Sequence, residues 1–269
     1  MPTMETDACK GLSASVPYGI EKEIQEVVFI GDIHGRTIWK KIIDLEPDAD
    51  RYVFFGDYFD PYEPISFEVQ AQNFRDLLNL KAQLGERVVL LLGNHDYHYY
   101  ANVRPYSRYD FRNANTIKSL LTENLQAFRI AFQFGNFLCS HAGVSTRWLD
   151  TWFPGGWVWK GIDQKINSLH AEKPEAFDYF EGDRSGYGED ERQGPLWIRP
   201  NSLSKAINIQ ITQVFGHTRK VRIQNDPFSN LKGLFCTDSL EQNFYSKLTN
   251  SLIEDSISIG YDTRIDDLS

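Results

Sequence analysis

Short apolar runs followed by Gly recur along this chain of 269 residues and predict its strands. The runs 27–30, 52–55 and 88–92 hold four or five apolar residues each, and runs of this length bounded by Gly are typical of fully buried strands. Between them, residues 35–46 and 66–85 carry apolar side chains at intervals of three and four residues, which predicts two helices. Strand and helix therefore alternate, and this order predicts parallel strands joined by right-handed crossovers.

The later part of the chain predicts one more helix and further strands. Residues 115–128 have the pattern of a helix, and residues 129–139, with Gly135 and Asn136 at the centre, predict a hairpin with a turn of the primed type. Three further stretches predict the last strands: 207–215, 233–235 and 256–259. We assign these strands to a second, more antiparallel sheet.

The chain shows no repeat and no low-complexity linker, which favours one α/β domain of two or three layers over residues 24–262. Residues 1–23 are polar and carry Gly and Pro without a period, so we expect an N-terminal arm. Residues 145–205 are expected to form a surface insertion, because four tryptophans gather around Gly155 and Gly156 and a Gly-rich acidic run follows them. The tryptophans are expected to form a small core of this insertion rather than a base-stacking platform.

Composition and charge narrow the class of protein. The chain is 41% hydrophobic and 24% charged, as in ordinary globular proteins, and no apolar run approaches the roughly 18 residues needed to cross a bilayer. No basic segment leads into an apolar one at the start, and the three cysteines lack disulfide or metal spacing, so we expect a soluble protein of the cytoplasm. The net charge of -9 argues against general nucleic-acid binding, but not against a phosphate substrate, because bound cations dominate their local field.

Side chains that bind metal ions or protons follow the apolar runs directly. They comprise four of the six histidines, the best-placed carboxylates and one asparagine: Asp32 and His34, Asp57 and Asp60, Asn94 and His95, His141, and His217. Ligand sites in α/β proteins are usually built at the ends of strands. Each segment alone is also compatible with a purely structural role, but the joint occurrence of these segments in this order predicts a functional site.

Carboxylate, amide and imidazole ligands without any thiolate select ions such as Mn, Fe, Zn or Co. Asp32 and His34 are two residues apart and can chelate one ion, and the two oxygens of Asp57 can bridge to a second ion. Three residues remain to complete the second ion site: Asn94, His141 and His217. Two ions a few ångströms apart would share a hydroxide nucleophile and bind the oxygens of a transferring phosphoryl group.

His95 is expected to face away from the neighbouring ligand, which makes it a candidate general acid for the leaving oxygen. Asp60 is expected to orient this imidazole or to raise its pKa. We assign His98 to an aromatic loop over residues 97–112, and His170 to the surface of a helix. The loop interleaves Tyr with Arg, and it is either a wall of the site or a segment that packs its aromatic rings under itself.

The order of these motifs resembles the calcineurin-like metallophosphoesterase family, from residue 27 to about residue 250. The family pattern of GD-x-HG, GD, GNH with Asp or Glu, HAG or HGG, and GHT is met by these segments: 31–35, 56–57, 93–96, 141–143 and 216–218. Within the family, the closest resemblance is to the phosphoprotein phosphatases and the bacterial symmetrical diadenosine tetraphosphatases. Residues 56–60 look like their GDYVD, residues 195–200 are similar to their LLW segment, and residues 236–239 and 247–249 resemble their closing DSG and KLT.

This resemblance implies a central mixed β-sandwich flanked by helices, which is the metallophosphoesterase fold. It also implies a site with two divalent metal ions. The first ion would be bound by Asp32, His34 and Asp57. The second would be bound by these residues: Asp57, Asn94, His141 and His217. His95 with Asp60 would be the proton-donating pair.

The chain departs from those phosphatases after Asp60, where they continue with Arg and Gly and this chain has Pro61 and Tyr62. An arginine that clamps the substrate phosphate is therefore absent at that position. Six arginines are candidates to replace it: Arg36, Arg104, Arg108, Arg112, Arg199 and Arg219. Arg219 also stands where many phosphodiesterases of the family carry a second His, which favours the phosphatase branch.

These residues predict a dinuclear metal-dependent phosphoesterase that hydrolyses phosphomonoesters by means of a metal-bridging hydroxide, with manganese as the first choice of ion. Its substrate would be a phosphorylated protein or a small molecule. One alternative is a hydrolase of dinucleoside polyphosphates, for which the Tyr and Arg loop would supply stacking and charge. Two others are a non-catalytic phosphate-binding or scaffold protein and a nuclease, against which the acidic charge weighs. No membrane association is expected, and the oligomeric state stays open.

Overall fold

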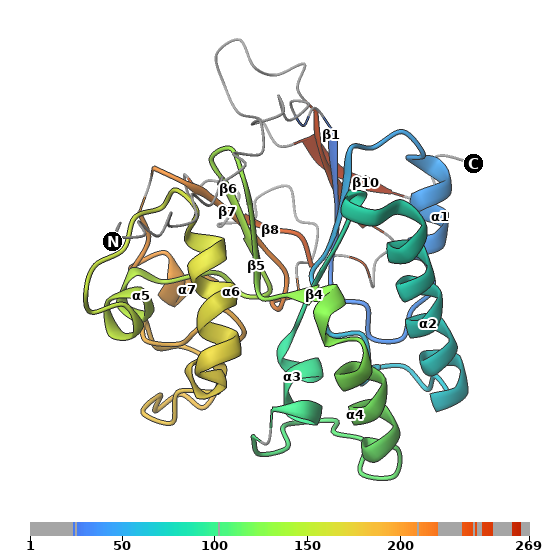
Figure 1. The fold of residues 1–269 in the computed structure, drawn as a ribbon, viewed down its shortest axis with the longest axis horizontal. Coiled ribbons are helices and arrows are strands. Elements are labelled where there is room, and N and C mark those ends of the chain that lie inside the picture. Colours follow the sequence, from blue (N-terminus) through green and yellow to red (C-terminus); the bar gives the residue numbers. More distant parts are fainter. Residues whose placement is uncertain are drawn as a thin grey trace, which may run out of the picture.

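The computed structural model of the protein describes residues 24, 26–101, 103–208, 210–219, 233–238, 240, 244–249 and 260–264, with the backbone alone for 244, 249 and 260–264. These residues form two β-sheets with helices on their outer sides (Figure 1). The predicted arm over 1–23 and the predicted strand over 256–259 lie outside the described residues. Within the described part of the chain, no helix is both long enough and apolar enough to span a bilayer.

The larger sheet has six strands in the order β10-β9-β1-β2-β3-β4. Their bounds are β1 Glu26–Ile30, β2 Arg51–Phe54, β3 Val88–Leu91, β4 Phe128–Arg129, β9 Phe244–Thr249 and β10 Gly260–Arg264. The strands β1, β2, β3 and β4 run parallel, whereas β9 pairs antiparallel with both β1 and β10. The prediction of parallel strands in the first part of the chain is confirmed.

The smaller sheet has four strands in the order β5-β6-β7-β8. Their bounds are β5 Ala131–Phe134, β6 Phe137–Ser140, β7 Thr212–Phe215 and β8 Leu234–Cys236. β5 and β6 form the predicted hairpin, and Gly135 in its turn has the positive φ (49°) that a primed turn requires. The prediction that the last strands make this sheet more antiparallel is wrong, because β6, β7 and β8 run parallel. Long connections bring the chain back to the same end of the sheet, and the antiparallel strands β9 and β10 join the larger sheet instead.

Helices cover the outer faces of both sheets. Their bounds are α1 Trp39–Leu45, α2 Phe67–Leu84, α3 Asn94–Tyr100, α4 Ala114–Glu123, α5 Thr146–Trp152, α6 Ile162–Glu172 and α7 Pro200–Leu203, with 3-10 turns at Gly85–Arg87, Leu125–Ala127 and Pro174–Phe177. In Figure 1, α1 and α2 lie on one side of the strands and α5, α6 and α7 on the other, while α3 and α4 lie at the lower edge. The expected arrangement of mixed sheets flanked by helices is confirmed.

The three predicted helices exist, but only α2 has its predicted length. Its N-cap is as the sequence suggests, because the Ser66 hydroxyl accepts a hydrogen bond from the backbone N–H of Val69. α1 begins only at Trp39, since the backbone N–H groups before it pair with the loop after β2. α4 ends at Glu123 because Phe128, which was expected in the helix, begins β4 and pairs with β3.

Alternation along the strands divides the apolar side chains between two layers. Along β1, Val27 and Phe29 face the smaller sheet, where they share a cluster of buried side chains with Cys139 of β6. The alternate residues Val28 and Ile30 belong to a larger cluster with side chains of α1, α2 and α4. The first cluster joins the two sheets into a sandwich, and the second fixes helices on its outside.

Residues 145–205 contain α5, α6 and α7. Trp148 is 1% exposed and belongs to the same buried cluster as Val28 and Ile30 of the larger sheet. Trp152, Trp157 and Trp159 are partly buried against that cluster. The tryptophans therefore pack in a core as predicted, but in the main core and not in a separate core of the insertion. The division of the chain into an arm, a domain and an insertion stays a prediction.

Gly56 lies where the loop after β2 passes the loop after β3. Its φ is 98°, and a Cβ atom at this position would lie 2.4 Å from the backbone nitrogen of Gly93. We expect Gly56→Ala to lower the free energy of unfolding by more than about 2 kcal/mol, because the left-handed backbone alone costs an L-residue ~1–2 kcal/mol and the backbone contact adds to that cost. Urea denaturation followed by circular dichroism measures the loss.

Gly135→Ala is the matched control, since Gly135 also has positive φ but has no neighbouring atom within 4 Å of its Cβ position. This variant should lose only the conformational part of the free energy. Equal losses in the two variants would show that the close approach at Gly56 is unimportant.

Candidate active site

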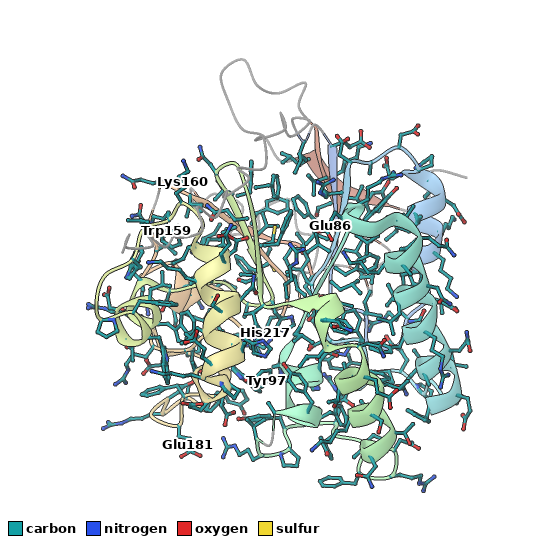
Figure 2. The ribbon with its side chains drawn as sticks, in the orientation of Figure 1. Glu86, Tyr97, Trp159, Lys160, Glu181 and His217 are labelled. Atoms are coloured by element: carbon teal, nitrogen blue, oxygen red, sulfur yellow. The ribbon has the colours of Figure 1, made fainter. Side chains whose placement is uncertain are left out.

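The eight residues predicted for metal and proton chemistry lie at the carboxyl ends of five strands. Asp32 and His34 follow β1, Asp57 and Asp60 follow β2, Asn94 and His95 open α3 directly after β3, His141 follows β6 and His217 follows β7. Seven of them are at most 6% exposed, and His217 is half-buried. Figure 2 shows His217 near the centre of the molecule. The structure therefore brings together the residues that the sequence only places at separate strand ends.

The first group of candidate metal ligands is formed by His34 and Asp57. His34 Nδ1 lies 3.0 Å from the carbonyl oxygen of Phe59, and because a carbonyl oxygen only accepts, Nδ1 carries the proton. The other ring nitrogen, Nε2, therefore presents its lone pair, and it lies 3.6 Å from Asp57 Oδ2. Two electron-pair donors face each other with no proton between them, as ligands of a cation do.

The second group is formed by Asn94, His141 and His217. His141 Nδ1 donates to the carbonyl oxygen of Phe55 at 2.6 Å, so its Nε2 carries the lone pair. This nitrogen lies 2.9 Å from Asn94 Oδ1 and 3.1 Å from His217 Nδ1, and the last two atoms are 3.0 Å apart. At most one proton, on His217 Nδ1, is available to these three atoms. Their convergence fits a cation bound by all three.

Asp57 connects the two groups. Its Oδ2 lies 3.6 Å from His34 Nε2 and 3.7 Å from His141 Nε2, so one carboxylate oxygen faces an imidazole of each group. Asp32 is fixed close by, because its Oδ1 accepts the backbone N–H of His217 at 3.0 Å. Ligand atoms of Asp32, Asp57 and His141 all lie within 4.8 Å of one another, and all three residues are buried. This geometry suits two ions that share Asp57.

Burial makes these charges costly unless a cation compensates them. It raises the pKa values of Asp32 and Asp57 well above the usual carboxyl range, and the nearby carboxylates of Asp238 and Asp96, respectively, raise them further. Burial also lowers the pKa of His141 to about 3, so this imidazole is neutral at pH 7 and available to a metal ion. The donor set and its electrostatics thus fit two divalent cations.

His95 and Asp60 are in contact, as the resemblance implies for a proton-donating pair. His95 Nδ1 donates to Asp60 Oδ2 at 2.9 Å, and Asp60 also accepts hydrogen bonds from His98 Nε2 at 2.8 Å and from the Tyr99 hydroxyl. Burial favours the neutral acid, but the hydrogen bonds from His95 and His98 outweigh it and lower the pKa of Asp60. Asp60 is therefore an anion with three donors, and it fixes the ring of His95.

His98 and helix α3 were missed from the sequence. His98 is 3% exposed, and its Nδ1 accepts the backbone N–H of Tyr106 at 3.2 Å, which leaves the Nε2 proton for Asp60. A signal for the helix was present, because Asp96 stands three residues after Gly93 and its carboxylate accepts the backbone N–H of Gly93 at 2.9 Å. His98 therefore belongs to the site and not to the loop.

Two tyrosine rings of the loop after α3 pack against rings outside the loop. Tyr99 stacks on Tyr109 with ring centroids 4.5 Å apart, and Tyr106 lies 4.3 Å from Trp197. The tyrosines thus follow the second of the two expectations for this loop. His170, expected at the surface, is half-buried because α6 packs towards α3, and its Nε2 lies 2.7 Å from the Tyr100 hydroxyl.

Among the six candidate arginines, Arg108 reaches the proton-donating pair: its Nη2 lies 2.9 Å from His95 Nε2. The others lie as follows: Arg36 pairs with Glu63, Arg104 with Glu181, Arg199 donates to the carbonyl oxygen of His217, Arg219 lies over the ring of Tyr62, and Arg112 is exposed. Figure 2 shows Glu181 at the edge of the molecule, away from His217. The structure therefore does not bring Arg104 to the site.

Comparisons with known proteins agree with this geometry. A family model described as calcineurin-like phosphoesterase matches residues 26–218 of the chain. The solved structure of a cold-active protein tyrosine phosphatase from a psychrophilic Shewanella species has 19% sequence identity and a TM-score of 0.56, with 84% of this chain and 76% of that chain covered. Another structure of a cold-active protein tyrosine phosphatase has 19% identity and a TM-score of 0.55, with 85% and 75% covered. At this identity the likeness shows a shared fold, and no curated protein matches the chain significantly.

We expect metal ions to stabilise the protein, and to do so more at pH 8 than at pH 5. Burial raises the pKa values of Asp32 and Asp57, so the metal-free protein is destabilised as pH rises through these values and both carboxylates ionise. At low pH, protons compete with the ions for the same oxygens. The melting temperature, measured with Mn²⁺ and with EDTA at both pH values, tests this expectation. A free Mn²⁺ concentration of 100 times Kd at one site would raise the free energy of unfolding by about 2.7 kcal/mol.

Asn94→Ala is the matched control, because it removes a ligand without changing a charge. It should reduce the shift in melting temperature caused by Mn²⁺ at pH 8. A protein whose melting temperature is the same in Mn²⁺ and in EDTA at both pH values would contradict the assignment of these residues as ligands.

Proposed function

The chain belongs to the calcineurin-like phosphoesterase family, and from this premise we propose that it is a dinuclear metal-dependent phosphatase that hydrolyses phosphomonoesters. The observation that carries the proposal is the position of Asp57, with one carboxylate oxygen between the lone pairs of His34 and His141. A scaffold protein without activity would not require this buried arrangement beside a hydrogen-bonded His and Asp pair. The phosphatase is therefore the function that the geometry supports best.

We assign the first metal ion to Asp32, His34 and Asp57. The second is assigned to these residues: Asp57, Asn94, His141 and His217. When bound, two divalent ions supply Lewis acidity for the phosphoryl oxygens and an activated water as nucleophile. Manganese is the first choice and Fe, Zn and Co are the alternatives, because the ligand atoms are oxygen and nitrogen with no thiolate among them.

His95 is the proposed proton donor to the leaving oxygen. Its Nδ1 is committed to Asp60, so the proton that it transfers must come from Nε2. Its backbone N–H donates to Asp57 Oδ1 at 2.9 Å, which holds the residue at a fixed place beside the bridging carboxylate. Burial lowers the pKa of His95, and the bond to Asp60 opposes this change by stabilising the imidazolium. Asp60 therefore positions the donor and favours its charged form.

A phosphorylated protein or small molecule is the proposed substrate. The similar solved structures bear the name of protein tyrosine phosphatases, which supports a monoester. A dinucleoside polyphosphate would need exposed aromatic faces for its bases, but Tyr109 stacks on Tyr99 of α3 and Tyr106 packs against Trp197. Phe111 is the described loop residue with a largely exposed ring, at 78%. The monoester is therefore favoured.

We also propose a cytoplasmic location. Cys139 is buried as a free thiol, which suits a reducing compartment. General nucleic-acid binding is not part of the proposal because the net charge is -9, and membrane association is not part of it because no apolar run of the sequence approaches the roughly 18 residues needed to cross a bilayer.

Two substitutions separate metal binding from proton transfer. Asn94→Ala should reduce both the metal content and the hydrolysis of an aryl phosphate, because it removes a ligand. His95→Ala should keep the metal content but lower kcat by about 10²–10⁴-fold, the usual contribution of a general acid. Metal analysis and steady-state kinetics of the Mn²⁺-loaded variants measure both quantities.

His170→Ala is the control histidine variant, because His170 lies on α6 against Tyr100 and away from the proposed ligands. It should retain both metal and turnover. Full activity of His95→Ala would rule out its role as the acid, and release of nucleotide from a dinucleoside tetraphosphate, without turnover of the aryl ester, would favour the alternative substrate class.

A further inference from the structure

Pro61 and Tyr62 stand where the resembling phosphatases carry Arg and Gly, and two guanidinium groups lie over the ring of Tyr62. Arg108 Cζ is 3.3 Å from the ring centroid and Arg219 Cζ is 3.4 Å from it. Atoms at these distances lie above the ring and not beside it, and one face has no room for both. The two arginines therefore cover opposite faces of Tyr62, and cation–π attraction holds them there.

This stack lies directly beside the metal ligands. The rings of Tyr62 and His34 meet edge to face with centroids 4.8 Å apart. Of the two arginines, Arg108 is on the inner side, because its Nη2 is 2.9 Å from His95 Nε2, whereas Arg219 is exposed. Tyr62 thus presents one guanidinium to the centre of the site and one to its rim.

Arg108 has a hydrogen-bond donor that nothing in the described residues accepts. Its Nε is buried without a hydrogen-bond partner among them. A buried N–H of this kind costs free energy unless an acceptor arrives, and a guanidinium presents Nε and Nη donors in a planar fork that matches phosphate oxygens. The unused donor therefore indicates an anionic ligand.

The backbone of Arg108 has positive φ, as do several residues of the family motifs. Five non-glycine residues in the described part of the chain have positive φ: His34, Asp57, Asp60, Arg108 and His217. Four of them are proposed ligands or the partner of the proposed acid. Such conformations cost free energy in L-residues and cluster at functional sites. Arg108, at 63°, is the fifth and belongs to none of the family motifs.

We propose that Arg108 binds the phosphate group of the substrate, positioned by stacking on Tyr62, and so replaces the arginine that is absent after Asp60. This inference rests on the proposed function and deepens it. The phosphate oxygens would accept hydrogen bonds from Arg108 Nε and from Arg108 Nη2, which donates to His95 Nε2 in this structure. Both faces of the Tyr62 ring are covered by arginines, so neither face is open to a stacking base.

The test compares Mn²⁺-loaded wild type with Arg108→Ala and Arg108→Lys, using orthophosphate binding by calorimetry and hydrolysis of an aryl phosphate. Arg108→Ala should raise both the Kd of orthophosphate and KM by about 10- to 100-fold, the usual loss for hydrogen bonds to a charged group, with metal content unchanged. Arg108→Lys should recover only part of this loss, because an ammonium keeps the charge without the planar fork.

Tyr62 is the positioning residue, and its variants test the stack. Tyr62→Leu should raise the Kd of orthophosphate more than Tyr62→Phe, since phenylalanine offers the same face to the guanidinium. The effect of Tyr62→Leu should nearly vanish in the Arg108→Ala background, because Tyr62 acts through Arg108. Additive effects in the double variant would overturn the positioning role.

Arg104→Ala is the matched control, because Arg104 lies in the same loop and pairs with exposed Glu181. It should bind orthophosphate as the wild type does. An unchanged Kd and KM in Arg108→Ala, or a loss in Arg219→Ala as large as in Arg108→Ala, would overturn the inference while leaving the phosphatase in place. Weaker orthophosphate binding by Arg108→Ala, in a protein whose wild type hydrolyses no phosphoester, would support the inference and reject the proposed function.

Discussion

The buried carboxylate of Asp57 is the constraint on which the rest of the structure depends. It is 2% exposed, and its closest ring nitrogens present lone pairs and not protons, so they do not neutralise it. The backbone N–H of His95 donates to Asp57 Oδ1, but this bond does not offset the cost of burial, and the pKa of Asp57 is raised by burial and then by Asp96. Divalent cations bound here would remove this cost. Metal binding at Asp57 would therefore stabilise the folded chain and couple its stability to the proposed function.

A second buried carboxylate, Asp96, fixes the loops that carry the candidate ligands. Asp96 accepts the backbone N–H groups of Gly93, Asp57 and Tyr58 at 2.8–2.9 Å, and burial raises its pKa to about 7. These bonds join the loop after β2 to the start of α3. They place Asp57 beside Asn94 and help to hold a backbone with positive φ at Asp57, which an isolated loop would not adopt. The fold positions the site through such backbone contacts as much as through the apolar cores.

The sequence predicts the strands and the ligands because both are local signals. An apolar run followed by Gly and a polar residue is a pattern contained within about ten consecutive residues. Parallel strands then bring the ends of these runs to the same edge of the sheet. The parallel course of β7 and β8 and the position of β9 beside β1 depend on long connections, which leave no local pattern. The sequence likewise offers six candidate arginines and does not single out Arg108, because the contacts of Arg108 with His95 and Tyr62 join residues that are far apart in the sequence.

The contact between Arg108 and His95 links substrate binding to the proposed proton donor. While His95 Nε2 accepts the hydrogen bond of Arg108, its lone pair is committed, and this nitrogen has no proton to give to a leaving oxygen. A phosphate group is anionic and a stronger acceptor than a neutral imidazole, so it draws the guanidinium away from Nε2. The same event would orient the phosphate and free the Nε2 lone pair, which must then take up a proton from solvent before His95 can protonate the leaving oxygen. On this assignment Nε2 is open to protonation only when a phosphate occupies the site, and Tyr62 keeps Arg108 within reach of both acceptors.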